Sequence, residues 1–161
     1  LVDVGFLGAL QIDRYGNLNS TLIKEENGIR HFTGSGGAAD IATLSKNVYS
    51  IVKHEKRKIV EFVDFITSVG YLNGGETRRE CGLPMCRSIK IISNLCVMGF
   101  TPETRELQVE SIHPGITKEE VIKNTGYPIY VSPGAKVTDE PTDEELYLLR
   151  NKIDPKGMYI K

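Results

Sequence analysis

A glycine-rich segment is the part of this 161-residue sequence whose residue types are best suited to chemistry. It reads GSGGAAD from Gly34 to Asp40. Glycines allow a ligand to approach backbone N–H groups closely. The N-terminus of a helix that follows them offers further N–H donors and favours a negatively charged ligand. Such donors suit a carboxylate, a phosphate or the oxyanion of a tetrahedral acyl intermediate. Without a ligand, the same residues would make a tight entry into a helix.

The glycine segment also fits the G-x-G-x-x-A variant of the dinucleotide fingerprint. Glu55 follows it about 20 residues later. In dinucleotide-binding domains an acidic residue at this spacing binds the ribose of the cofactor. The residues before the glycines make a poor first strand, because Arg30 and His31 are polar. An NAD-binding domain is therefore an alternative whose strand–loop–helix context is weak.

Cysteine and histidine are the remaining residue types that could bind a metal or act as nucleophiles. Cys81, Cys86 and Cys96 form an odd and sparse set, which does not resemble the framework of a small secreted domain. His54 and His113 are the nearest companions by type, but the C-x2-C spacing of zinc sites is missing. We expect reduced thiols, no metal and a cytoplasmic location.

The overall composition excludes several classes of partner. The chain carries 20 Lys and Arg residues against 21 Asp and Glu, a net charge of -1. This balance gives no reason to expect nucleic acid or an anionic membrane as a partner. No apolar run approaches the roughly 18–20 residues that span a bilayer, and no signal-peptide pattern is visible. Hydrophobic residues make up 40% of the chain, enough for one domain with a core.

Alternating strands and helices must position these residues. Apolar segments predict strands at residues 2–10, 18–23, 48–53, 89–100, 106–112 and 127–132, of which the first and third should be buried. Helices are expected at residues 38–46, 55–65, from Thr117 and at 142–151. Turns or loops should occupy residues 13–17, 24–28, 66–86 and 101–103, the last of which joins two strands as a hairpin. The pattern favours an α/β fold with a mainly parallel sheet.

Several stretches in the same order resemble the β subunits of class I coenzyme A transferases, in particular those of the glutaconate CoA-transferase group. They are LVDVGFLGALQIDRYGNLNST, GSGGAADIA, IVKHEKRKIVEFVDFITSVGYLNGG and ELQVESIHPGITKEEVIKNTGYPIYVSP. The resemblance to succinyl-CoA:3-oxoacid CoA-transferase is looser. The resemblance implies an open, mainly parallel sheet with helices on both faces and an antiparallel hairpin.

The resemblance also implies an activity and a partner. Enzymes of this family move CoA from an acyl-CoA to a carboxylic acid, for example a dicarboxylate such as glutaconate, through a glutamyl-CoA thioester. An α subunit shares the active site, so a hetero-oligomer is expected, with CoA as a substrate and no permanently bound cofactor. The nucleophilic glutamate precedes the LGALQ stretch in the family. Residues 1–161 are therefore expected to be a single domain, the C-terminal part of a β subunit, without that glutamate and inactive alone.

Site residues follow from the motif match. The backbone of Gly36, Gly37 and Ala38 should stabilise the oxyanion, and the substrate should lie near Gln11, Gly34 and Ser35. Glu26 stands in an E-N-G triplet like that of the family's nucleophile. It directly precedes the glycine segment, however, and we interpret it as part of a turn.

Two alternatives within the resemblance remain open. The parent protein could be a CoA-thioester hydrolase or ring-opening enzyme, or this chain could be a non-catalytic scaffold. Basic residues at 54–58, together with Arg78 and Arg79, could meet a CoA phosphate, although such charges usually form a solvated face.

Overall fold

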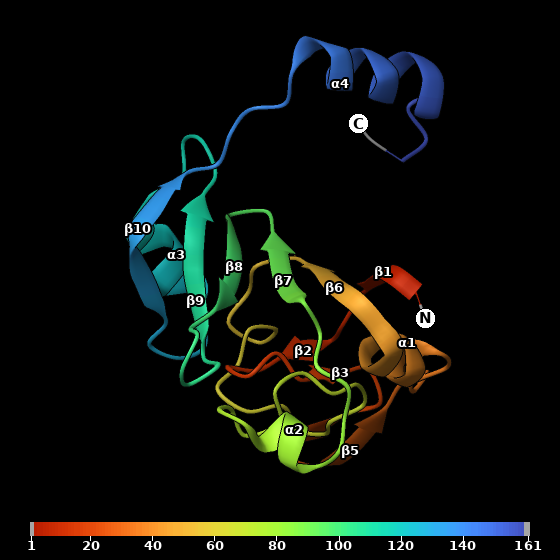
Figure 1. Ribbon diagram of the computed structural model, residues 1–161, viewed down its shortest axis with the longest axis vertical. Helices are drawn as coiled ribbons and strands as arrows, with labels where there is room; N and C mark the ends of the chain where they lie inside the picture. The colour runs from red at the N-terminus through yellow and green to blue at the C-terminus, as the bar shows by residue number, and fades with distance from the viewer. Residues whose placement is uncertain (1, 160–161) are drawn as a thin grey trace.

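A six-stranded sheet forms the frame of the molecule in the computed structural model, which describes residues 2–159. Its strands, in spatial order, are β1 (Val2–Leu7), β6 (Ser45–Val52), β7 (Ser88–Ser93), β8 (Cys96–Phe100), β9 (Leu107–Ile112) and β10 (Tyr130–Val137). The pairs β1/β6, β6/β7 and β9/β10 are parallel, whereas β7/β8 and β8/β9 are antiparallel. The predicted mainly parallel sheet and its antiparallel hairpin are therefore confirmed (Figure 1).

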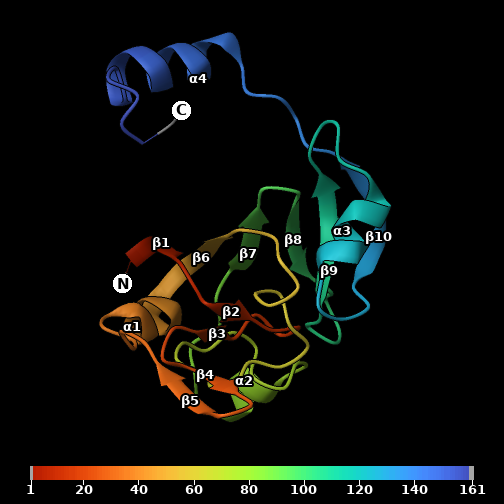
Figure 2. The same cartoon turned by 180° about the vertical axis from the view of Figure 1, so that it is seen from behind.

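The helices are short and lie at different ends of this sheet. Helix α1 (Ala38–Leu44) packs against β1 and β6, and α2 (Thr77–Glu80) is a single turn in a long irregular segment. Helix α3 (Lys118–Asn124) lies beside β9 and β10, as both Figure 1 and Figure 2 show. Helix α4 (Asp143–Leu148) continues into a π-helical segment, η1 (Leu149–Ile153), and stands apart from the sheet.

The starts of two helices agree with the sequence signals. Thr117 caps α3 by accepting a hydrogen bond from the N–H of Glu120. Thr142 and Glu145 form a reciprocal capping box at α4. Both helices therefore begin where the threonine followed three residues later by glutamate predicts.

The hydrophobic core joins the sheet to an irregular layer built from residues between β1 and β7. Ile91, Met98 and Val109 enter it from the sheet, while Ile12 and Ile59 enter it from the layer, and all five are fully buried. The layer contains a small pair of strands, β2 (Gln11–Ile12) and β3 (Leu18–Asn19), and a hairpin of β4 (Leu22–Glu25) and β5 (Gly28–His31).

The first strand is shorter and more exposed than predicted. Val2, Val4 and Phe6 are 50%, 41% and 63% exposed, and within β1 only Gly5 and Leu7 are buried. The prediction of a buried strand was wrong because β1 is an edge strand. One of its faces points away from the core.

The amphipathic helix predicted at residues 55–65 does not form. The backbone there pairs with β2 instead: Ile12 N–H donates to Lys58 O at 2.7 Å, and Val60 N–H donates to Ile12 O at 2.9 Å. Ile59 is buried by this pairing, whereas Phe62 remains 61% exposed. The apolar spacing reflected contacts of an extended chain, and tertiary pairing overrode helix propensity.

Other boundaries moved in smaller ways. The strand predicted at residues 18–23 is divided between β3 and β4, and the region at 89–100 is two strands with a turn between them. The strand expected from residue 127 begins at Tyr130, and the loop expected at 24–28 is part of the β4/β5 hairpin. None of the helices in the described part of the chain has the length and apolar character needed to cross a bilayer.

A buried histidine connects the ends of β6, β7 and α3. His54 follows β6, and its Nδ1 and Nε2 lie 3.0 and 2.9 Å from the hydroxyl oxygens of Ser93 and Thr125. Cys96 Sγ lies 3.7 Å from the same Nδ1. Burial lowers the pKa of His54 to about 4 and raises the pKa of the Cys96 thiol to about 11. Both groups are therefore neutral at pH 7 and serve packing.

The pKa of His54 makes the protein less stable in mild acid. The unfolded chain takes up a proton near pH 6.5, but the folded chain resists protonation until about pH 4. Neutral His54 therefore contributes up to about 3 kcal/mol to the free energy of unfolding. This contribution is present in full above pH 6.5 and is lost as the pH falls towards 4. Urea unfolding of the wild type and His54→Gln at intervals between pH 7 and 4.5 measures it. The wild-type curve should fall more steeply than that of His54→Gln, and parallel curves for the two proteins would contradict this assignment.

Candidate functional site

The glycine segment forms an exposed loop between β5 and α1, outside any regular strand or helix. Gly34 and Gly36 have positive φ angles of 83° and 48°, which favour glycine. Gly37 has an ordinary φ of -85° and caps α1, which begins at Ala38 as predicted. The loop conformation thus depends on two of its three glycines.

The loop leaves a specific pair of glycine donors free. Gly34 N–H donates to Ser20 O at 3.1 Å, and Ala38 N–H donates to Ser35 O at 2.8 Å. Within the described chain, the N–H groups of Gly36 and Gly37 have no acceptor, and both residues are exposed. Of the three donors predicted for an oxyanion, Gly36 and Gly37 are available, whereas the N–H of Ala38 is already used inside the loop.

Side chains of neighbouring segments hold the start of the loop. Ser20 Oγ donates to Gly34 O at 2.9 Å, and Ser20 N–H donates to Thr67 Oγ1 at 2.9 Å. The hydroxyls of Thr21 and Thr67 lie 2.7 Å apart. These polar contacts connect the loop to the irregular layer. The orientation of the loop therefore depends on Ser20, Thr21 and Thr67 as well as on its glycines.

Arg78 fixes the other end of this unit. Its side chain is completely buried and donates to five backbone carbonyl oxygens, those of Pro84, Gly70, Val69, Ala42 and Thr43, at 2.7, 2.7, 3.2, 3.1 and 3.5 Å. Two of these carbonyls end α1, the helix that the glycine loop opens. Both interpretations offered for Arg78, a phosphate contact and a solvated charge, are therefore wrong. An arginine in a glycine-rich loop gives no sequence signal that it will be buried, whereas Arg79 beside it is exposed as expected.

Gln11 is buried in a network of amides and carboxylates. Its Nε2 donates to Asp64 Oδ2 at 2.9 Å, and its Oε1 accepts from Asn19 Nδ2 and Asp64 N–H at 2.8 and 3.0 Å. Asp64 Oδ2 also accepts from Lys24 N–H at 3.1 Å. Most of the hydrogen-bonding capacity of Gln11 is thus committed within the protein, and the residue acts chiefly to fix its neighbours.

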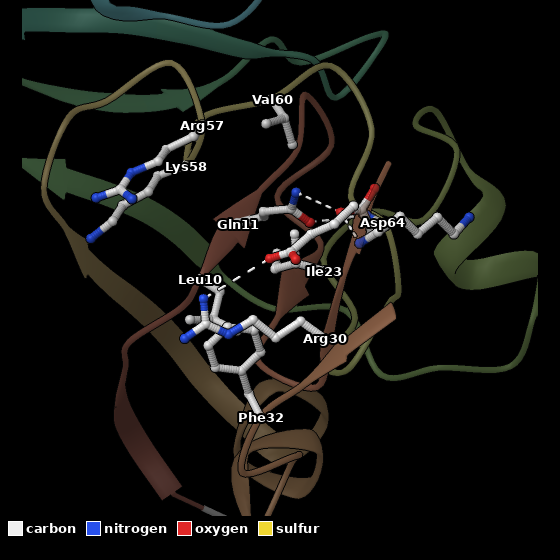
Figure 3. Close-up of a pocket in the computed structure, with 11 residues that line it drawn as sticks. Leu10, Gln11, Ile23, Arg30, Phe32, Arg57, Lys58, Val60 and Asp64 are labelled. Carbon is white, nitrogen blue, oxygen red and sulfur yellow. Dashed lines mark hydrogen bonds and ion pairs between the residues drawn. The ribbon is translucent and has the colours of Figure 1, made fainter. Parts of the chain in front are cut away.

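The Gln11 network forms part of the wall of a cavity of about 660 Å³, hereafter the Gln11 cavity (Figure 3). Its lining combines four basic, two acidic, one amide and four apolar side chains: Lys24, Arg30, Arg57, Lys58, Glu25, Asp64, Gln11, Leu10, Ile23, Phe32 and Val60. Residues 34–38 do not line it. The structure thus places Gln11 and the glycine loop near the same layer but does not join them in one cavity.

Three acidic residues of this region, Glu26, Glu55 and Asp13, lack the surroundings of an activated nucleophile. Glu26 lies in the exposed turn of the β4/β5 hairpin, as predicted. Hydrogen bonds from Lys53 and Arg57 lower the pKa of Glu55 to about 2. Burial raises the pKa of Asp13, but this carboxylate accepts hydrogen bonds from Tyr15 and Asn17 within a turn.

The topology also decides against the dinucleotide fingerprint. The strand before the glycine loop is β5, which pairs only with β4 in a two-stranded hairpin. A dinucleotide site requires that strand inside a parallel sheet, with the helix crossing back over it. The NAD-binding alternative is therefore wrong. Among residues 2–159, no group of three or more His, Cys, Asp or Glu side chains could hold a metal ion, and all three cysteines are free thiols.

Comparison with known proteins gives consistent matches. The family model described as coenzyme A transferase matches residues 1–124. The chain is 45% identical to the β subunit of 3-oxoadipate CoA-transferase from Pseudomonas knackmussii over 92% of this chain and 58% of that protein. It is 34% identical to the β subunit of glutaconate CoA-transferase from Acidaminococcus fermentans over 98% of this chain and 59% of that protein.

Two crystal structures share the fold. Glutaconate coenzyme A-transferase from Acidaminococcus fermentans has a TM-score of 0.88 at 34% identity, covering 98% of this chain and 61% of that one. IpdAB from Rhodococcus jostii has a TM-score of 0.81 at 30% identity, covering 96% and 62%. The chain spans about three fifths of the length of these relatives.

Proposed function

The chain belongs to the coenzyme A transferase family, and from this premise we propose that it is the C-terminal part of a class I CoA-transferase β subunit. The parent enzyme moves CoA from an acyl-CoA to a carboxylic acid and works with an α subunit in a cytoplasmic hetero-oligomer. Matches to the β subunits of two CoA-transferases over more than nine tenths of the chain support this assignment. Both acids named in those relatives, 3-oxoadipate and glutaconate, carry two carboxylates, which favours a dicarboxylate substrate.

The reaction proceeds by exchange of acyl groups on an enzyme glutamate. The glutamate carboxylate attacks the carbonyl carbon of the acyl-CoA thioester. The CoA thiolate departs, and the acyl group and the glutamate are joined as a mixed anhydride. The thiolate then attacks the glutamyl carbonyl, releases the first acid and forms the glutamyl-CoA thioester. The acceptor carboxylate regenerates the anhydride on this glutamate, and the thiolate finally takes the new acyl group. CoA is a substrate throughout, and no resident cofactor is required.

The free N–H groups of Gly36 and Gly37 are the observation that carries this mechanism. Each attack on a carbonyl develops negative charge on one oxygen, and backbone donors held in place stabilise it without reorganising. The exposed position of both donors leaves room for an acyl group in front of them. We place the nucleophilic glutamate outside residues 1–161, because Glu26, Glu55 and Asp13 do not suit the role.

A hydrolytic parent enzyme is the second candidate, and a specific match favours it. The chain is 33% identical to the cholesterol ring-cleaving hydrolase IpdB subunit from Rhodococcus jostii over 94% of its length. The same donors would stabilise the oxyanion formed when water attacks. The higher identity to the 3-oxoadipate CoA-transferase chain supports transfer over hydrolysis.

We expect the isolated 161-residue chain to show no CoA transfer, whereas the complete complex with its α subunit is active. Both are assayed with acetyl-CoA or succinyl-CoA as donor and with glutaconate or 3-oxoadipate as acceptor, by chromatography of the acyl-CoA products. Formation of the new acyl-CoA by the complex supports transfer, and release of free CoA without a new thioester supports hydrolysis. Substantial turnover by the isolated chain would contradict the external nucleophile, and a complex inactive in both assays would favour a scaffold.

A further inference from the structure

The glycine loop is attached to the irregular layer by one residue. Gly34 and Ser20 share two hydrogen bonds: Gly34 N–H donates to Ser20 O at 3.1 Å, and Ser20 Oγ donates to Gly34 O at 2.9 Å. No other hydrogen bond in the described chain joins residues 33–37 to the layer. A Cβ added at Gly34, Gly36 or Gly37 would meet no atom within 4 Å, so side-chain packing does not hold the loop either. The position of the free donors at Gly36 and Gly37 therefore depends on Ser20.

The hydroxyl of Thr67 in turn holds the segment that carries Ser20. Thr67 Oγ1 accepts from Ser20 N–H at 2.9 Å and lies 2.7 Å from Thr21 Oγ1. Thr21 O accepts from Phe32 N–H at 2.8 Å, two residues before Gly34. One hydroxyl group thus supports both places where the chain leading into the loop is hydrogen-bonded.

The backbone of Thr67 is fixed to a buried part of the layer. Thr67 N–H and Ser68 N–H donate to Leu18 O at 2.8 and 3.0 Å, and Leu18 N–H donates to Ser68 O at 2.9 Å. Leu18 and Ser68 are both buried. Hydrogen bonds therefore run without a break from this buried pair through Thr67 and Ser20 to Gly34. We call the side-chain contacts of Ser20 and Thr67 the Ser20–Thr67 clamp.

The clamp lies outside the hydrophobic core. The side chains of Ser20 and Thr67 are half-buried, and the apolar contacts of the layer are made by other residues such as Ile12 and Ile59. Backbone donors stabilise an oxyanion most effectively when they do not have to reorganise as the charge develops. A loop whose attachment is loosened no longer meets this condition, and a displacement of about 1 Å is enough to cost a large factor in rate.

We propose that Ser20 and Thr67 are positioning residues for the reaction: through Gly34 they hold the N–H groups of Gly36 and Gly37 in the orientation that receives the oxyanion. This inference rests on the proposed function, because it concerns the same donors. Neither hydroxyl touches the substrate. Both act through the backbone of the glycine loop.

The test is steady-state kinetics of the complete complex carrying Thr67→Val, beside a thermal melt. Valine keeps the branched shape but removes the acceptor of Ser20 N–H and the contact with the Thr21 hydroxyl. We expect kcat to fall roughly ten- to a hundredfold, with the KM for acyl-CoA changed by less than about twofold. Ser20→Ala, which removes the bond to Gly34 O directly, should lower kcat in the same way.

Two further variants separate positioning from a general effect on folding. Thr67→Ser restores the hydroxyl and should recover most of the kcat. Thr138→Val is the matched control, because Thr138 Oγ1 is half-buried and lies 2.8 and 2.9 Å from Ser111 Oγ and His113 Nδ1. Thr138 directly follows β10, at the opposite edge of the sheet from β1. Its replacement should leave kcat unchanged.

Hydrogen exchange of the peptide at residues 33–38, measured by mass spectrometry on the same complexes, follows the clamp without reference to activity. Exchange should be faster in Thr67→Val than in the wild type, because Gly34 N–H loses protection, and unchanged in Thr138→Val. Unaltered exchange in Thr67→Val would show that the hydroxyl does not hold the loop and would overturn the proposal.

The kinetic outcomes keep this proposal apart from the proposed function. A wild-type complex with transfer, in which Thr67→Val has a normal kcat and a normal melt, would reject the positioning role alone. A Thr67→Ser complex as slow as Thr67→Val would also reject it, since the effect would then belong to the methyl group. A wild-type complex with neither transfer nor hydrolysis would reject the proposed function and the positioning role with it.

Discussion

Replacing Arg78 with methionine is expected to lower the free energy of unfolding by about 3–5 kcal/mol. The guanidinium is fully buried and satisfies carbonyl oxygens of three separate segments, including Ala42 and Thr43 at the end of α1. Methionine fills much of the same volume but donates no hydrogen bond, so these acceptors lose their partner without gaining water. Urea unfolding followed by circular dichroism measures the loss.

A matched control lies at the next position. Arg79 is exposed, and its Nε pairs with Glu76 Oε2 at 2.9 Å on the same helical turn. Arg79→Met should therefore change stability by no more than about 0.5 kcal/mol. If Arg78→Met is as harmless as Arg79→Met, the guanidinium does not hold the segments together. A variant Arg78→Lys should recover part of the stability, because an ammonium reaches some but not all of the carbonyls.

The second large effect concerns catalysis by the complete complex rather than folding. We expect Gly36→Val to lower kcat on the order of 10²–10³-fold, the usual cost of losing an oxyanion donor. Gly36 has a φ of 48°, which a β-branched residue adopts only with strain, so the backbone must turn and carry the N–H away. The loss should appear mainly in kcat, because the donor acts where negative charge develops.

Folding should survive this change, since a Cβ at Gly36 would meet no atom within 4 Å. Gly37→Ala is the matched control: its φ of -85° suits any residue, its added Cβ is also unobstructed within this chain, and its N–H stays in place. That variant should keep most of its kcat. Steady-state kinetics and a thermal melt are the measurements, and a normal kcat for Gly36→Val with a normal melt would remove the oxyanion role.

Local sequence signals predicted the parts of this fold that depend on local interactions. The caps at Thr117 and Thr142 need only neighbouring backbone groups, and both were confirmed. The glycine loop and the helix that starts at Ala38 follow from the special backbone freedom of glycine. The motif match to the family predicted Gly36, Gly37 and Ala38 as donors, and the N–H of Ala38 is used inside the loop instead.

The features that could not be predicted depend on distant contacts. Residues 55–65 have a helical spacing of apolar residues, yet their backbone pairs with Ile12 far away in sequence. Arg78 looks like a surface charge because its carbonyl partners belong to other segments. The Gln11 cavity is assembled from separate stretches of chain, so no single motif predicts it.

The separation of α4 from the sheet divides the chain into units of very different cooperativity. Helix α4 runs directly into η1, and this helical arm leaves Tyr147 and Ile153 55% and 71% exposed. Isolated helices shorter than about 12–15 residues are marginal in water, so the capping box at Thr142 provides much of the local order. The helix–coil equilibrium of this arm is consequently uncoupled from global unfolding. Hydrogen exchange of the amide protons in α4 and η1 therefore reports on local opening. The unfolding transitions of the Arg78 and His54 variants report on the sheet and the irregular layer packed against it.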